Sequence, residues 1–124
     1  MIFLLVGLLL GQTVNVVTYD AFMQLDRQGR IHTFNQITAD NRAEVVRTHI
    51  QRWLEANRPR MNAEQIKLME ECIAFATPEA YSLPKSAETL ARAKELEART
   101  ALLFTRDEMF QALTIQGDYI RPKE

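Results

Sequence analysis

Two histidines, His32 and His49, are the residues of this sequence best suited to acid–base catalysis or metal binding. Neither lies in an H-E-x-x-H pattern or another spacing that turns two ligands toward one ion, so the sequence predicts no metal site. His49 borders an apolar stripe, where an imidazole can pack its ring and keep one N–H in water. This position favours a structural role for His49, and we expect His32 to be exposed.

The single cysteine, Cys72, is the one residue that could act as a thiol nucleophile. Reactive thiolates need a neighbouring base and electropositive surroundings, whereas Glu70 and Glu71 would raise the pKa of this thiol. Because Cys72 also flanks an apolar stripe, we expect a buried free thiol that packs like a small apolar side chain. A disulfide between two copies of an exported chain is the alternative.

Carboxylate pairs and serines offer no further catalytic pattern. Glu70-Glu71 and Asp107-Glu108 are adjacent in sequence, and adjacent side chains on a helix point about 100° apart, so neither pair forms a two-carboxylate site. The sequence has no G-x-S-x-G and no glycine-rich phosphate loop, and we expect its two serines, Ser82 and Ser86, in a loop and at a helix N-cap. We therefore expect no catalytic or cofactor-binding site. An enzyme that uses dispersed Asp, Glu and His49 side chains is the alternative.

Arginines gather between positions 42 and 60, where five of them and His49 stand against Glu44 and Glu55. An arginine can bind a carboxylate or a phosphate through two parallel hydrogen bonds. We expect a patch that docks an acidic protein partner or an anionic component of the cell envelope, formed by Arg47, Arg52, Arg58 and Arg60. A solvated helix face is the alternative. Nucleic acid is not an expected partner, because the net charge of the chain is −1.

The chain has 124 residues, enough for one domain, and its 47% hydrophobic and 25% charged residues are typical of a globular protein. Charge is absent from the beginning, since the first charged side chain is Asp20. Residues 1–10 are apolar and would span about 15 Å as a helix, roughly half of a bilayer's hydrocarbon core. This length is typical of the apolar part of an export signal.

We therefore expect residues 1–17 to be an export signal and the mature protein to be periplasmic or secreted. The sites closest to the small-residue rule for cleavage are Val14-x-Val16 and Val16-x-Thr18. Two alternatives stay open for this segment. It could be an N-terminal strand or helix buried in the fold, or, left uncleaved, a membrane tether through residues 1–19.

From Thr18 onward the apolar residues recur with helical period. The predicted helices cover residues 19–28, 30–36, 39–57, 63–76, 87–104 and 106–116. Residues able to cap a helix precede five of them: Thr18, Thr38, Asn62, Ser86 and Thr105. Gly29 and Gly117 should end the first and last helices, and a strand over residues 30–34 is the alternative to the second.

Apolar stripes mark the faces that these helices bury. The helix over 39–57 carries Val46, Ile50, Trp53 and Leu54. The helix over 63–76 carries Ile66, Met69, Ile73 and Ala76, widened by Leu68, Cys72 and Phe75. The helix over 87–104 carries Leu90, Ala93, Leu96, Thr100 and Leu103. Packing these stripes together predicts an all-α fold, a small bundle of four main helices plus one or two short N-terminal ones. We expect a single domain over 18–117 and a frayed tail over 118–124.

Five segments follow one another along residues 19–117: Phe34-x-x-Ile37-Thr38-x-x-x-Arg42-Ala43, the helix with His49, Met61-Asn62-x-Glu64-Gln65, Phe75-Ala76-Thr77-Pro78-Glu79 and Leu103-Phe104-Thr105-Arg106-Asp107-Glu108. In this order the chain resembles the bacteriocin fulvocin C-related proteins of bacteria. The resemblance implies an exported, mostly helical protein, and no functional residue comes with it. Many members end in a cysteine cluster, whereas this chain has no cysteine after Gln116.

The sequence thus predicts an exported helical protein that acts by contact with another macromolecule, and antagonism between bacteria is the activity that the resemblance adds. The alternatives are the enzyme with a dispersed site and a membrane-tethered structural module.

Overall fold

The computed structural model describes residues 16–82, 84–109 and 111–112, and the structural statements below concern these residues. Its elements in chain order are α1 (Tyr19–Met23), α2 (Arg27–Gln36), α3 (Ala39–Asn57), the 3-10 turn η1 (Arg58–Arg60), α4 (Ala63–Phe75), the 3-10 turn η2 (Pro78–Tyr81) and α5 (Ala87–Leu103). Residues 106–109 and 111–112 are also helical. This part of the chain contains no strand, so the predicted all-α class is confirmed.

Side-chain caps determine where the helices begin. At α4, Asn62 Oδ1 accepts the Gln65 N–H at 2.8 Å, and Gln65 Oε1 accepts the Asn62 N–H at 2.9 Å. Thr105 and Glu108 form a second reciprocal pair before residue 106. These two capping boxes satisfy backbone donors that have no partner inside the helix, as the sequence predicts. Single caps begin α1, α3 and α5, also as predicted: Thr18, Thr38 and Ser86.

The boundary between α1 and α2 differs from the prediction. α1 ends at Met23, and Asp26 begins α2 by accepting the Gly29 N–H on its Oδ1 at 2.8 Å. Gly29 therefore lies in the first turn of α2, and the prediction that it ends a helix over 19–28 is wrong. An Asp side chain at the N-cap satisfies a free backbone donor, which outweighs the helix-breaking tendency of glycine here. The alternative strand over 30–34 is wrong as well, because these residues are helical.

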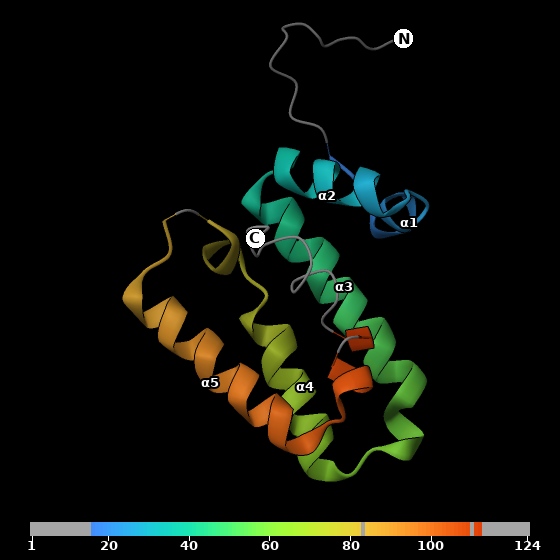
Figure 1. Cartoon of the computed structure of the whole chain (residues 1–124), viewed down its shortest axis with the longest axis vertical. Coiled ribbons are helices and arrows are strands. Elements are labelled where there is room, and N and C mark those ends of the chain that lie inside the picture. The colour runs from blue at the N-terminus through green and yellow to red at the C-terminus, as the bar shows by residue number, and fades with distance from the viewer. Residues whose placement is uncertain (1–15, 83, 110, 113–124) are drawn as a thin grey trace, which may run out of the picture.

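The helices are arranged around α3 and α4 (Figure 1). α4 packs against α3 on one side and against α5 on the other. α1 packs on α3, and η2 lies against α3 as well. Phe104, which follows α5, meets Trp53 of α3 with the ring centroids 5.9 Å apart. Gln111, among the helical residues after Thr105, contacts His49 and Trp53 of the same helix. Residues distant in sequence are thereby gathered along α3.

Apolar side chains from every main element form the core. Those that are almost completely buried include Phe22, Phe34, Val45, Val46, Ile50, Leu68 and Met69. The stripe predicted for α3 is confirmed at Val46, Ile50 and Leu54, and Trp53 beside them is half-buried. Of the stripe predicted for the helix over 63–76, Met69 and Ala76 are buried as predicted, whereas Ile66 and Ile73 are only partly buried. Leu68 and Cys72 are buried beside them, so the buried face of α4 is shifted toward two of the residues that we expected only to widen the stripe.

The stripe predicted for α5 is wrong at its first residue. Leu96 and Thr100 are buried as predicted, but Leu90 is 48% exposed. Successive residues turn by about 100°, so Leu90 points about 120° away from Leu96, while a residue seven positions from Leu96 points within about 20° of it. Leu90, Ala93 and Leu96 follow one another at intervals of three residues, and residues at this interval rotate progressively away from the buried face of the helix.

Some predictions fall outside the described residues. They concern residues 1–15 of the predicted export signal, the last helix beyond position 112, Gly117, and the tail over 118–124. Among the helices that are described, none combines the length and the apolar composition that a membrane span requires.

Candidate functional site

The arginines of the predicted docking patch differ in what they contact. Arg47 is half-buried, and its Nη1 donates to the carbonyl oxygen of Ala76 at 2.7 Å. Ala76 is the residue that caps the end of α4, so Arg47 satisfies a carbonyl that the helix leaves without a partner. Arg52 Nη1 donates to Asp20 Oδ1 at 2.8 Å, and its guanidinium lies 4.8 Å from the centre of the Tyr19 ring. Arg47 and Arg52 therefore attach other elements to α3.

Arg58 and Arg60 lie together on η1, the turn that follows α3. Arg58 Nη2 donates to Glu55 Oε2 at 3.1 Å, and Arg60 donates to the side-chain oxygen of Asn57. Both contacts are local and exposed to solvent. Five positions separate Arg52 from Arg47, which turns these side chains about 140° apart on α3. The structure thus brings Arg58 and Arg60 together and directs Arg47 and Arg52 to separate contacts.

His49 is half-buried and uses both ring nitrogens. Its Nε2 lies 2.8 Å from the carbonyl oxygen of Gln111, and its Nδ1 lies 2.8 Å from the hydroxyl of Tyr19. A carbonyl can only accept, so Nε2 carries the proton and Nδ1 accepts from the tyrosine. His49 thereby connects α1 and the residues after Thr105 to α3. This arrangement favours the structural role predicted for His49. His32 is exposed, as predicted.

His49 should make the stability of the protein depend on pH below about 6.5. Burial lowers the pKa of His49 below its usual value of 6.5, although the hydrogen bond to Gln111 partly opposes this. The unfolded chain then binds a proton that the folded chain does not, so stability falls as pH drops below about 6.5. We expect the melting temperature to fall from pH 7.5 to 5.5, and to fall less in His49→Gln. His32→Gln is the matched control and should keep the full pH dependence.

Glu71 joins α4 to α5 through two arginines, Arg92 and Arg99, that no sequence motif indicates. Arg99 donates to both Glu71 oxygens at 2.8 Å, and Arg92 donates to Oε1 at 3.0 Å. Arg92 also pairs with Glu95 at 2.6 Å. The hydrogen bonds from Arg99, and then those from Arg92, lower the pKa of Glu71 to about 2. The two arginines are seven positions apart, a spacing that puts both on one face of α5.

This cluster predicts an acid-sensitive contribution to stability. Because the pKa of Glu71 is lower in the folded chain, its contribution is present above about pH 4.5 and is lost as pH falls toward 2. Wild type should therefore lose more thermal stability than Glu71→Gln between pH 5 and pH 2. Glu70→Gln, at the exposed neighbouring position, should follow wild type. If Glu71→Gln follows wild type throughout, the cluster does not contribute.

Cys72 is buried, as predicted, and burial raises the pKa of its thiol. We expect the thiol of the folded protein to react with iodoacetamide on the order of 100-fold more slowly than that of the urea-unfolded chain. Mass spectrometry of a labelling time course measures both rates. Equal rates would mean that Cys72 is accessible, and would return the intermolecular disulfide to consideration.

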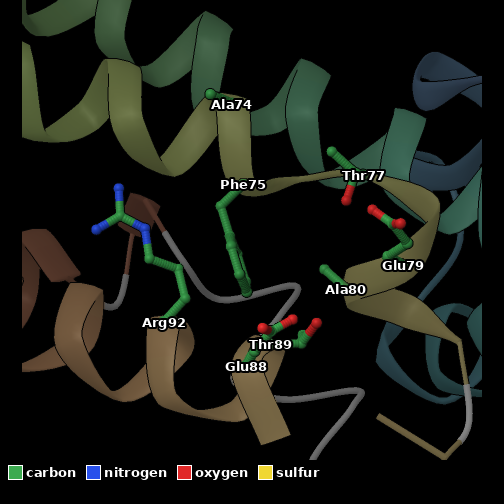
Figure 2. Close-up of a pocket in the computed structure, with 8 residues that line it drawn as sticks. All are labelled: Ala74, Phe75, Thr77, Glu79, Ala80, Glu88, Thr89 and Arg92. Atoms are coloured by element: carbon green, nitrogen blue, oxygen red, sulfur yellow. The ribbon is translucent and has the colours of Figure 1, made fainter. Parts of the chain in front are cut away.

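A small hollow lies between the end of α4, η2 and the start of α5 (Figure 2). Its volume is about 220 Å³, below the roughly 300–1,000 Å³ of typical small-molecule sites. Phe75 reaches into the hollow, and the carboxylates of Glu79 and Glu88 lie along it (Figure 2). Both glutamates are exposed, and His49 is not part of the lining. The hollow therefore does not assemble the dispersed Asp, Glu and His49 site considered as the alternative.

Metal ligands are not clustered in the described ranges, where no group of three His, Cys, Asp or Glu side chains could hold an ion. Comparisons of the chain with protein-family models, with curated proteins and with solved structures find no match.

Proposed function

We propose that the protein is exported and acts outside the cytoplasm by contact with an acidic macromolecule, through the basic corner formed by Arg58 and Arg60 on η1. Export is supported by the apolar residues 1–10 and by the absence of charged side chains before Asp20. The contact surface is proposed because two guanidinium groups, those of Arg58 and Arg60, lie on one exposed turn. The resemblance described above extends the proposal to antagonism between bacteria.

The intramolecular contacts of the basic corner are weak enough to be exchanged for a partner. The Arg58–Glu55 ion pair is solvent-exposed, with side-chain exposures of 41% and 71%, and such pairs contribute roughly 0–1 kcal/mol. A carboxylate or phosphate that binds the guanidinium in a bidentate manner can therefore replace Glu55 with little loss of stability. Arg60 donates to the neighbouring Asn57 side chain, an equally local and exposed contact.

Site-specific photocrosslinking in cells tests this proposal. A photoreactive amino acid at the exposed Ala56, within four positions of both arginines, should give a discrete crosslinked product, and the same amino acid at the exposed Ala91 of α5 should give none. In a second arm, Arg60→Glu should lower the crosslinking yield from position 56 by more than about tenfold, because like charges repel. Lys94→Glu reverses an exposed charge on α5 and should leave the yield within about twofold. Equal products from positions 56 and 91 would contradict the proposal.

A further inference from the structure

The backbone of Val17 is attached to the fold by the side chain of Asn41. The Val17 N–H donates to Asn41 Oδ1 at 2.8 Å, and Asn41 Nδ2 donates to the Val17 carbonyl at 2.9 Å. Asn41 lies in the first turn of α3 and is only 4% exposed. Its amide therefore pairs with Val17 much as a neighbouring strand would, and a buried polar group depends on Val17 for its hydrogen bonds.

Thr18 and Tyr19, the two residues after Val17, also form hydrogen bonds within the fold. Thr18 caps α1 by accepting the Ala21 N–H on its Oγ1 at 3.1 Å, and the hydroxyl of Tyr19 contacts His49. Val16, by contrast, is 76% exposed. The Val16–Val17 peptide bond thus separates an exposed residue from one whose backbone is hydrogen-bonded to the buried Asn41.

Together with the proposed export, on which this inference rests, these contacts distinguish the two cleavage sites that the sequence offers. We propose that the export signal is removed at the Val16–Val17 bond. A signal peptidase would add water across that bond, leaving a carboxylate on Val16 and an ammonium group on Val17. The new ammonium group retains N–H donors for Asn41 Oδ1 and adds a positive charge, which strengthens such a hydrogen bond.

Cleavage after Thr18 would give a poorer product. It removes Val17, so the Asn41 side chain would be buried without the two partners that it now has. It also removes the side chain that caps α1. A cut at the Val16–Val17 bond keeps all of these contacts, and the residue that it removes from the folded part is the exposed Val16.

The mass of the exported chain is the direct test. The full chain is expressed in a bacterial host, recovered from the periplasm and the medium, and analysed by intact-mass spectrometry. We expect a chain that begins at Val17. An exported chain that begins at Tyr19, or at any other residue, would overturn the cleavage site and leave export standing. If no chain leaves the cytoplasm, export fails together with the inference.

Two variants make the test independent of that single mass. Val16→Phe places a bulky side chain next to the proposed bond, against the small-residue rule, and should abolish the Val17 product. Because Val16 is exposed, the substitution should not disturb the fold.

In the exported protein, Asn41→Ala should lower the melting temperature by on the order of 10 °C, and Asn35→Ala, at an exposed position, by no more than about 2 °C. An unchanged Val17 product from Val16→Phe, or an unchanged melting temperature in Asn41→Ala, would contradict the inference.

Discussion

Replacing Phe34 by alanine is expected to lower the free energy of unfolding by about 3–5 kcal/mol, the largest effect of any substitution considered for this protein. Phe34 is 1% exposed, and its ring meets those of Phe22 and Tyr81 edge-on, with centroids 6.2 and 6.3 Å away. Removing the ring takes away apolar contacts with α1 and η2 at once. It also leaves a cavity that the surrounding helices can fill only in part.

Urea denaturation followed by circular dichroism measures the effect. Leu102→Ala is the matched control, since Leu102 is an apolar residue that is 83% exposed, and it should change the free energy of unfolding by less than about 0.5 kcal/mol. A loss below about 1 kcal/mol in Phe34→Ala would mean that α2 does not pack as described.

Replacing Arg42 by methionine is expected to lower the free energy of unfolding by about 2–3 kcal/mol, since hydrogen bonds to charged groups contribute more than neutral ones. Arg42 Nε donates to the Phe34 carbonyl at 2.7 Å, Nη1 to the Tyr81 carbonyl at 3.1 Å and Nη2 to the Asn35 carbonyl at 3.2 Å. The guanidinium also lies 5.7 Å from the centre of the Phe34 ring. One side chain of α3 thus joins the end of α2 to η2.

A charge-conserving variant distinguishes the effect of the hydrogen-bond geometry of Arg42 from the effect of its positive charge. Arg42→Lys keeps the positive charge but cannot reach three carbonyls in one plane, so it should recover less than half of the stability lost in Arg42→Met. Arg60→Met removes an arginine from the exposed turn η1 and should lie within about 0.5 kcal/mol of wild type. Full recovery by lysine would show that charge, and not the planar fork, is what matters.

Helix boundaries could be predicted where they depend on residues that are close together in the sequence. A capping box needs only residues three positions apart, and both Asn62 with Gln65 and Thr105 with Glu108 form as predicted. The predicted boundary after α1 is wrong because two local signals compete. Asp26 can begin a helix and Gly29 can end one, and the structure shows that Asp26 prevails.

Contacts between distant residues could not be predicted in the same way. Asn41 and Val17 are 24 positions apart, and Arg42 and Tyr81 are 39 positions apart. Nothing in the spacing of these residues indicates that they meet. The buried Asn41 and the half-buried Arg42 are therefore absent from the predicted core, although they attach α2, η2 and the N-terminal residues to α3.

The predicted docking patch illustrates the same limit at the candidate site. Arg47, Arg52, Arg58 and Arg60 are close in sequence, which groups them as one basic stretch. Helical geometry turns Arg47 toward the end of α4 and Arg52 toward α1, so only Arg58 and Arg60 remain together on one turn. A patch on a helix depends on angular position as well as on sequence distance.

Cell fractionation tests most directly whether the apolar segment exports a helical domain that folds without it. The full chain and a chain lacking residues 2–10 are expressed in the same bacterial host, and both are followed by immunoblotting and by thermal unfolding of the purified proteins. We predict that the full chain leaves the cytoplasm, that the shortened chain stays inside, and that both unfold at the same temperature to within about 2 °C. A full chain retained in the cytoplasm, together with a large loss of stability in the shortened chain, would show instead that residues 2–10 belong to the core.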